Sequence, residues 1–314
     1  MSAYKTQPQS TNHILMVRPV RFGFNPETAQ TNAFQDAELA VQTKDVAQQN
    51  ALQAFDNMTA QLSAAGVDII VVEDRPQPYT PDSIFPNNWI SFHQSGKVLL
   101  YPMQAENRRL ERRMDIVEGL RERFQVEEII DLTHFENQGK FLEGTGSMVL
   151  DRRYKIAYAC LSPRTDAEVL DVFAQTMGYE IVAFEAVDAN GKAVYHTNVL
   201  MCVGDNFAAV CLAAIPNADQ RLTVRNKLIE TGKQVIEITL AQMNSFAGNM
   251  LLVNNKRGEK LLVMSTQAFE SLTAKQRDEL DDYAALWHFD LSVIEGNGGG
   301  SARCMMAEIH LPEK

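Results

Sequence analysis

The sequence predicts a mixed α/β protein in which five modules of the ββαβ type close into a ring, forming a pseudo-fivefold α/β propeller. Two observations support this fold class: one pattern of apolar and polar segments recurs along the chain, and its copies are evenly spaced. Each copy has a small or polar first residue, an apolar run, a turn, a second apolar run and the polar start of a helix. The first residues are Asn88, Ser147, Asn198, Asn249 and Cys304, which lie successively 59, 51, 51 and 55 residues apart.

The two apolar runs of a copy are joined by residues that favour hairpin turns. These turns are Ser95-Gly96, Asp151-Arg152-Arg153, Asp205-Asn206 and Asn254-Asn255. A stretch with helical start signals, such as Ser, Thr, Asp or an early Pro, follows each hairpin. We expect helices over 107–124, 166–177, 216–231 and 266–283, each leading into a further apolar run, and an N-terminal helix over 36–65.

The last module predicts how the ring closes. Its apolar run begins at Cys304 and lacks a partner strand, while residues 14–17 form an unpaired apolar run near the N-terminus. Pairing these two runs would remove the free sheet edges of an open structure. We therefore expect one domain over 13–314, preceded by a loose tail over 1–12; the alternative is an open α/β sheet of two halves.

Composition restricts the class of partner. The chain has 314 residues with 45% hydrophobic and 22% charged residues, which excludes a disordered or coiled-coil protein. A net charge of −11 argues against nucleic acid or an anionic membrane as the main partner. The longest apolar stretch, 199–215, is interrupted by Asp205-Asn206 and indicates two strands rather than a membrane span. Residues 1–12 lack the apolar core of a signal peptide, so we expect a cytoplasmic protein.

The module starts are the first place to look for a functional site, because equivalent positions of a closed ring converge at its axis. Cys304 follows the segment Gly296-Asn-Gly-Gly-Gly-Ser-Ala-Arg, whose small residues let the backbone approach a ligand closely. His196 precedes Asn198 by two positions, so strand alternation would turn both side chains to one face. A buried core position is the alternative for Cys304 and His196, and it is the expected position of the other cysteines, Cys160, Cys202 and Cys211.

Two acidic residues lie close to module starts. Glu143 stands between apolar residues and glycines in Phe-Leu-Glu-Gly-Thr-Gly, and Asp82 precedes Asn88 in Pro-Asp-Ser-Ile-Phe-Pro-Asn-Asn-Trp. A loop salt bridge is the alternative for Glu143, and an ordinary turn residue is the alternative for Asp82. Neither the cysteines nor the histidines have the spacing of a metal site, so we expect no metal.

Together these motifs resemble the guanidine-modifying superfamily of pentein fold, which comprises arginine deiminases, dimethylarginine dimethylaminohydrolases, agmatine deiminases and amidinotransferases. The resemblance covers nearly the whole chain. Leu142-Glu143-Gly144 is similar to the Leu-Glu-Gly-Gly-Asp motif, His196-Thr-Asn198 to His-x-Asp, and 298–304 to the C-terminal Gly-rich nucleophile motif. Residues 82–88 resemble the substrate motif of the first module, and residues 16–28 resemble the branch of citrulline utilisation hydrolases.

The departures from these motifs concern charge. Superfamily members that bind a guanidinium have carboxylates at the first-module and His-x-Asp motifs, where this chain has Asn87, Asn88 and Asn198. A carboxylate suits a cationic guanidinium, whereas an amide can both donate to and accept from a neutral ureido group. The sequence therefore favours citrulline or a related ureido compound. The acid of Gly-Gly-Asp is also missing, since Gly144-Thr-Gly-Ser147 stands there.

The resemblance implies covalent catalysis that needs no cofactor. Cys304 would attack the ureido carbon, His196 would transfer protons, and Glu143 would orient His196. The products of citrulline would be ornithine, ammonia and carbon dioxide, formed through an S-carbamoyl enzyme. Residues that would contact this amino-acid substrate are Asp82, Asn87, Asn88 and Asn198, with an unidentified arginine on the carboxylate, for which Arg18, Arg108, Arg109 and Arg152 are candidates.

Two other functions fit the same resemblance. One is hydrolysis of a guanidine substrate, as in arginine deiminases and dimethylargininases. The other is a non-catalytic propeller that binds a translation component, which would have no use for Cys304, His196 and Glu143 together. The oligomeric state is left open.

Overall fold

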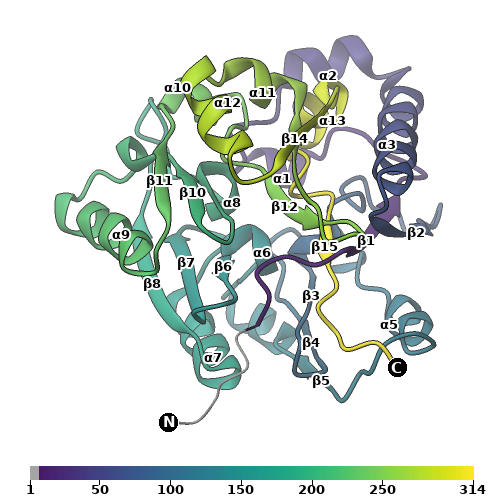
Figure 1. Ribbon diagram of the computed structural model, residues 1–314. Coiled ribbons are helices and arrows are strands. Elements are labelled where there is room, and N and C mark those ends of the chain that lie inside the picture. Colours follow the sequence, from purple (N-terminus) through teal and green to yellow (C-terminus); the bar gives the residue numbers. More distant parts are fainter. Residues whose placement is uncertain (1–6) are drawn as a thin grey trace.

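Five three-stranded sheets surround a common centre in the computed structural model of the protein, which describes residues 7–314 (Figure 1). In each sheet the middle strand pairs antiparallel with one neighbour and parallel with the other. The innermost strands lie against one another around the centre: β15 against β3, β6 against β9, and β9 against β12. The predicted pseudo-fivefold α/β propeller is thus confirmed.

The strands follow the same order in every sheet, from the innermost outward. They are β15 (Ala307–Glu308), β1 (His13–Arg18) and β2 (Asp68–Glu73); β3 (Ile90–Phe92), β4 (Lys97–Leu100) and β5 (Glu128–Asp131); β6 (Val149–Asp151), β7 (Ile156–Leu161) and β8 (Glu180–Glu185); β9 (Met201–Val203), β10 (Phe207–Val210) and β11 (Gln234–Glu237); β12 (Leu251–Asn254), β13 (Lys260–Ser265) and β14 (Ala285–Phe289).

Longer helices connect the middle strand of each sheet to its outer strand, and short helical turns precede inner strands. The helices are α1 (Pro26–Ala29), α2 (Ala37–Thr43), α3 (Ala47–Ala64), α4 (Glu106–Arg109), α5 (Met114–Leu120), α6 (Gly144–Ser147), α7 (Ala167–Met177), α8 (Thr197–Leu200), α9 (Ala218–Glu230), α10 (Leu240–Asn244), α11 (Thr266–Ser271), α12 (Ala274–Asp281) and α13 (Ser292–Gly298), with 3₁₀ turns η1 (Pro86–Asn88), η2 (Thr133–Gln138) and η3 (Leu212–Ala214). Within residues 7–314, no helix has the length and apolarity needed to cross a membrane.

The ring closes through the two ends of the chain, as expected. Ile14 of β1 pairs with Glu308 of β15, and Leu15 pairs with Ala307, both antiparallel. On its other side, β1 runs parallel to β2 over six residue pairs. Since β15 is thereby paired, the last module is as complete as the other four.

Helix α7 shows how local sequence determines a module. The side chain of Asp166 caps it by accepting from the backbone N–H groups of Glu168 and Val169, and Gly178 ends it with a φ of +69°. Its buried residues include Leu170 and Phe173, which join the apolar cluster that also contains residues of β7. The start and end signals therefore fix the helix over the sheet that it covers.

Three predicted helices are each divided in two. The stretch 36–65 forms α2 and α3, and 107–124 forms α4 and α5. The stretch 266–283 forms α11 and α12, because Thr273 and Gln276 form a capping box that starts a new helix. Part of the Gly-rich segment before Cys304 is helical, since Gly296–Gly298 complete α13.

The predicted loose tail needs a similar correction. Gln9, Ser10 and Thr11 are buried. The Gln9 side chain donates to the carbonyl oxygens of Leu150 in β6 (2.8 Å) and of Val203 at the end of β9 (3.2 Å). Polar residues 9–11 are thus packed across the ends of the inner strands, while residues 1–6 lie outside the described part of the chain. The assignment of 13–314 to a single domain stays a prediction.

Candidate active site

The module starts meet at one end of the inner strands. The side-chain Nδ2 of Asn249 lies 3.3 Å from the Sγ of Cys304, and the Nδ2 of Asn198 lies 3.5 Å from the same sulfur. Asn249 also donates to the backbone oxygen of Asn198 at 2.8 Å. Three residues predicted to converge at the axis are therefore in direct contact.

The module starts occupy turns rather than strand positions. Asn88 ends η1, Ser147 ends α6, and Asn198 lies within α8. His196 is the residue that precedes the first turn of α8, in extended conformation. A helical turn, and not the strand alternation we expected, therefore sets the relation between His196 and Asn198.

His196 forms a buried pair with Glu143. Its Nε2 lies 2.8 Å from Oε2 of Glu143, and both residues are at most 2% exposed. The Glu143 carboxylate also accepts from the backbone N–H of Gln104 (3.0 Å) and from Nη1 of Arg164 (3.5 Å). Glu143 is thus surrounded by donors that hold it and the imidazole in place.

Burial and charge set the protonation of this pair. Burial lowers the pKa of His196 to about 4, although the hydrogen bond to Glu143 opposes that shift. Burial alone would raise the pKa of Glu143, but the charge of Arg164 and the hydrogen bond with His196 outweigh it and leave the carboxyl well below its usual pKa. At neutral pH the imidazole is therefore neutral, carries its proton on Nε2 towards Glu143, and keeps the lone pair of Nδ1 free.

Gly146 in α6 lets two functional groups approach each other. A Cβ atom at Gly146 would lie 2.4 Å from Nδ2 of Asn88 and 2.7 Å from Nδ1 of His196. Any side chain here would displace one of them. In the match of Leu142-Glu143-Gly144 to the superfamily's Leu-Glu-Gly-Gly-Asp motif, Gly146 stands at the position of the acid, so this chain has no side chain there.

A second cluster of buried polar groups is built around Arg108 of α4. Its guanidinium pairs with both carboxylate oxygens of Glu111 at 2.9 Å and donates to Oδ1 of Asn88, also at 2.9 Å. Asp82 lies nearby, with Oδ2 3.9 Å from Arg108 and 2.7 Å from Nδ2 of Asn25. Burial raises the pKa of Asp82, and the charge of Arg108 offsets this only in part.

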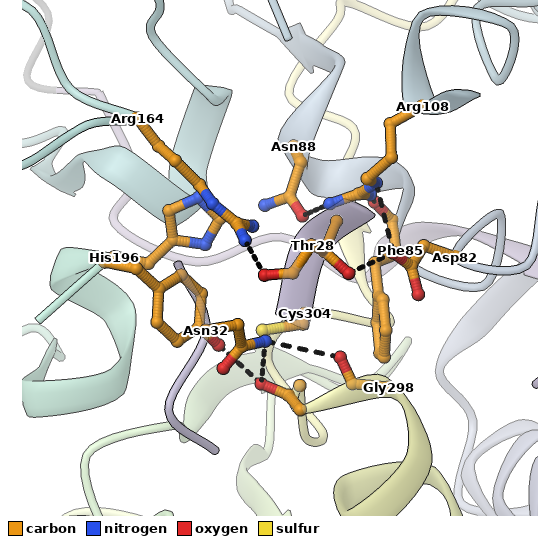
Figure 2. Close-up of a pocket in the computed structure, with 13 residues that line it drawn as sticks. Thr28, Asn32, Asp82, Phe85, Asn88, Arg108, Arg164, His196, Gly298 and Cys304 are labelled. Atoms are coloured by element: carbon orange, nitrogen blue, oxygen red, sulfur yellow. Dashed lines mark hydrogen bonds and ion pairs between the residues drawn. The ribbon is translucent and has the colours of Figure 1, made fainter. Parts of the chain in front are cut away.

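A cavity joins the two clusters (Figure 2). Figure 2 shows His196 and Arg164 on one side of it and Asp82 and Arg108 on the other. Its volume is only about 10 Å³, room for roughly one water molecule. The lining residues are Thr28, Asn32, Asp82, Phe85, Asn88, Arg108, Arg164, Tyr195, His196, Gly298, Gly299, Gly300 and Cys304.

Not every predicted site residue reaches this cavity. Glu143 lies behind His196, and Asn198 lies behind Cys304. Asn87 is directed elsewhere, since its Nδ2 donates to Thr145 in α6 at 3.2 Å. Asp82, Asn88, His196 and Cys304 do line the cavity.

Several polar atoms at this end are buried without a hydrogen-bond partner, which is uncommon in folded proteins. They include Oδ1 of Asp82, Oδ1 of Asn87, Nδ2 of Asn88 and Oδ1 of Asn198. At Asn88 the orientation of the amide is determined by Arg108, which can only donate and therefore faces Oδ1. The free group of Asn88 in the cavity is consequently an N–H donor.

The sequence of the chain matches a family model described as eukaryotic N,N dimethylarginine dimethylhydrolase over residues 18–311. The chain belongs to this family. A comparison with curated proteins finds no match.

Solved structures share the fold of this family member at low sequence identity. The apo structure of ArgZ, an arginine dihydrolase from the ornithine-ammonia cycle in cyanobacteria, has a TM-score of 0.75 at 16% identity, covering 96% of this chain and 41% of that one. Unliganded AgrE gives 0.74 at 16% identity, with 96% and 40% covered. A mutant of DDAH from Pseudomonas aeruginosa in complex with citrulline gives 0.61 at 14% identity, with 96% and 100% covered. The chain therefore spans about two fifths of the length of ArgZ and AgrE.

Some of the residues that line the cavity were not indicated by any sequence motif. Of the four candidate arginines only Arg108 lines the cavity, and Arg164 was not among them. Arg164 lies in the loop between β7 and α7, after Ser162-Pro163, where nothing in the sequence distinguishes it from a surface charge. Thr28 and Asn32 come from the N-terminal segment that covers the cavity, so only the folded chain brings them to the site.

Proposed function

We propose that the protein is a cysteine-dependent hydrolase of a ureido amino acid, converting citrulline to ornithine, ammonia and carbon dioxide. Membership of the family supports the coarser part of this proposal, hydrolysis of a C–N bond of a guanidino or ureido compound. Cys304, His196 and Glu143 are the proposed catalytic residues. The resemblance of residues 16–28 to citrulline utilisation hydrolases supports the finer part.

The observation that carries the citrulline proposal is the free Nδ2 of Asn88. It is a buried donor without a partner, on the wall of the cavity that Cys304 also lines. A ureido oxygen accepts a hydrogen bond from such a donor, whereas a guanidinium has only N–H donors and would leave it unpaired. An unpaired buried donor costs about 1–3 kcal/mol, which favours a ureido substrate by roughly that amount.

The chemistry proceeds in two steps with a balanced transfer of protons. The Cys304 sulfur attacks the ureido carbon, its proton passing to Nδ1 of His196 and then to the departing δ-nitrogen of ornithine. The C–N bond breaks and leaves an S-carbamoyl cysteine. His196 next removes a proton from water, which attacks the carbamoyl carbon, and the sulfur leaves with that proton. The released carbamic acid decomposes to ammonia and carbon dioxide.

The amino-acid end of the substrate needs one anionic and one cationic partner. Asp82 has a free carboxylate oxygen, Oδ1, for the α-ammonium group. For the α-carboxylate, Arg164 is better suited than Arg108. Arg108 is paired with Glu111 at 2.9 Å, whereas the contact of Arg164 with Glu143 is longer, at 3.5 Å, and its shorter bonds go to neutral oxygens of Thr28 (2.9 Å) and Thr31 (2.8 Å), which a carboxylate can replace.

Substrate entry requires that the N-terminal segment with Thr28 and Asn32, which covers the cavity, moves. A cavity of about 10 Å³ is far smaller than an amino acid. Thr28 and Asn32 close it, Asn32 by donating to the backbone oxygens of Gly298 (3.4 Å) and Gly299 (3.2 Å). When a substrate carboxylate takes Arg164 from Thr28 and Thr31, the segment loses these two contacts, and the bonds of Asn32 are the ones that must open for entry.

Hydrolysis of a guanidine substrate is the second candidate function. One observation favours it: the unpaired carboxylate oxygen of Asp82 lines the cavity and could receive a guanidinium. ArgZ, a structural neighbour, is described as an arginine dihydrolase. An observation against the guanidine function is that Arg108, at 3.9 Å, partly neutralises the Asp82 carboxylate.

Release of the amine product separates these candidates: ammonia from citrulline, arginine and agmatine, and dimethylamine from dimethylarginine. Purified protein is offered citrulline, arginine, dimethylarginine and agmatine separately, with the Cys304→Ser variant as background. We expect ammonia and ornithine from citrulline and at least about tenfold lower kcat/KM for the guanidines, which corresponds to 1.4 kcal/mol. Faster turnover of arginine or dimethylarginine than of citrulline would favour the second candidate function. Absence of turnover with all four compounds would contradict both functions.

A further inference from the structure

Asn249 anchors the sulfur of Cys304 from behind. It starts the fourth module, just before β12, and is fully buried. Its Nδ2 donates to Sγ of Cys304 at 3.3 Å and to the backbone oxygen of Asn198 at 2.8 Å, so both amide hydrogens are used. Its Oδ1 accepts from the backbone N–H of Arg303 at 3.0 Å.

These backbone contacts determine which way the amide faces. A flipped amide would place Oδ1 against the carbonyl oxygen of Asn198 and Nδ2 against the N–H of Arg303, pairing like with like at both ends. The donor is therefore fixed on the sulfur. The amide of Asn198 also donates to the sulfur, but its Oδ1 has no partner, so nothing besides Cys304 orients it.

The Asn249 amide can form a hydrogen bond with the Cys304 sulfur in either protonation state. The Nδ2 at 3.3 Å can donate to a thiolate, and Oδ1, which lies 3.7 Å from Sγ, can accept from a thiol. We propose that Asn249 is a further catalytic residue, which holds the Cys304 sulfur in position and stabilises its thiolate by hydrogen bonding. This inference rests on the nucleophilic role of Cys304 in the proposed function.

No positive charge within the described residues 7–314 contacts the sulfur directly, and its side-chain hydrogen bonds are those to the two amides. The titratable and charged groups that face Cys304 are its neighbour Arg303, Tyr195 and His196 before α8, and Asp82, Arg108 and Arg164 across the cavity. Burial keeps His196 neutral near pH 7, because its pKa is about 4. A thiolate there depends on the amides for direct stabilisation.

The thiolate can be titrated by its ultraviolet absorbance, independently of turnover. Each protein is compared with the same protein carrying Cys304→Ser, so that the difference reports Cys304 alone. Burial raises the pKa of Cys160 and of Cys202 to about 12, and these cysteines stay protonated over most of the titration. The variants are Asn249→Asp, which keeps the shape and the acceptor for Arg303, and Asn249→Ser. The control is Asn254→Asp, at the other end of β12.

Loss of a hydrogen bond to a charged group should move the pH midpoint of thiolate formation upward by about 1–2 pH units in both Asn249 variants. At a fixed pH we expect kcat to fall about 10- to 100-fold, with KM within about threefold. The Asn254→Asp midpoint should match that of the unaltered protein. Midpoints that do not move in folded Asn249 variants, shown by unchanged circular dichroism, would overturn the proposal.

A measurement on the unaltered protein covers the case in which both variants fail to fold. The side-chain amide NMR signals of Asn249 should shift with the Cys304 titration and lose this shift in Cys304→Ser, while those of Asn254 should not respond. Unresponsive Asn249 signals would refute the inference. A normal titration in a protein that does not hydrolyse citrulline would instead refute the proposed function and leave the role of Asn249 at the sulfur intact.

Discussion

Both ends of the inner strands bury charged side chains and leave polar atoms such as Nδ1 of His93 without a partner, but only at the Cys304 end do such atoms belong to residues that line the cavity. At the end opposite Cys304, Glu308 lies 2.7 Å from Arg303, 3.6 Å from Arg152 and 3.4 Å from His310, and Lys233 pairs with Asp151. At the Cys304 end, Asp82 and three asparagines each keep a buried polar atom without a partner. Burial of charge therefore does not identify the site. Unsatisfied hydrogen-bonding groups beside a cavity do identify it, because a ligand in the cavity can supply the partner that the protein does not.

The largest expected effect is at the Cys304 end. Cys304→Ser should abolish turnover, since serine is a much weaker nucleophile without a stronger base, and should leave thermal stability nearly unchanged. Cys160→Ser, at an equally buried position, should cost stability instead of kcat. Ammonia release by Cys304→Ser above about a tenth of the unaltered rate would contradict the assignment of the nucleophile.

The opposite end should respond in stability. Glu308→Gln removes the shared partner of two buried arginines and should lower the free energy of unfolding by about 3–5 kcal/mol. Because this cluster does not line the cavity, kcat of the folded fraction should change little. Urea unfolding and kcat at low temperature test both statements. A large drop in kcat with unchanged stability would show that the two ends are not separate in function.

Asn88→Asp tests whether the unpaired donor selects the substrate. The new carboxylate would pair with Arg108 through one oxygen and direct the other, an acceptor, into the cavity. Transition-state binding of citrulline should weaken by about 2 kcal/mol or more, which lowers kcat/KM roughly 30-fold. Inhibition by arginine should strengthen at the same time. The neighbouring Asn87→Asp, which does not line the cavity, should gain no affinity for arginine. Unchanged citrulline turnover in Asn88→Asp would remove the main support for a ureido substrate.

The smallest effect concerns His310, which lies in the ion-pair cluster around Glu308. Burial lowers its pKa to about 4, with the charge of Arg152 acting in the same direction. Below pH 6.5 the unfolded chain binds a proton that the folded chain does not, so stability falls as the pH drops from 6.5 towards 4. Between about pH 7 and pH 5 this residue should account for about 2 kcal/mol of that loss. In His310→Gln, urea midpoints should therefore fall less on acidification, and a loss equal to that of the unaltered protein would disprove this account.

The ring could be predicted from sequence because its signals are local and repeated. Even spacing of the module starts predicts which residues converge, and Asn198, Asn249 and Cys304 do meet. Arg164 could not be found in this way, because its position in the site depends on how the loop after β7 packs beneath the N-terminal segment. The breaks between α2 and α3 and between α11 and α12 lack Gly or Pro, so each stretch reads as one helix in the sequence, and at the second break the local signal is instead the capping box of Thr273 and Gln276.

The pairing of β1 with β15 has a consequence for how the chain is made. Ile14 leaves the ribosome long before its partner Glu308, because most of this chain lies between them. Until then the first sheet has its parallel pair, β1 with β2, but not its innermost strand, and Cys304 has not been synthesised. Contacts so distant in sequence form late and slowly. Synthesis of β15 and the segment before it thus completes the first sheet and brings the sulfur to the asparagines that contact it.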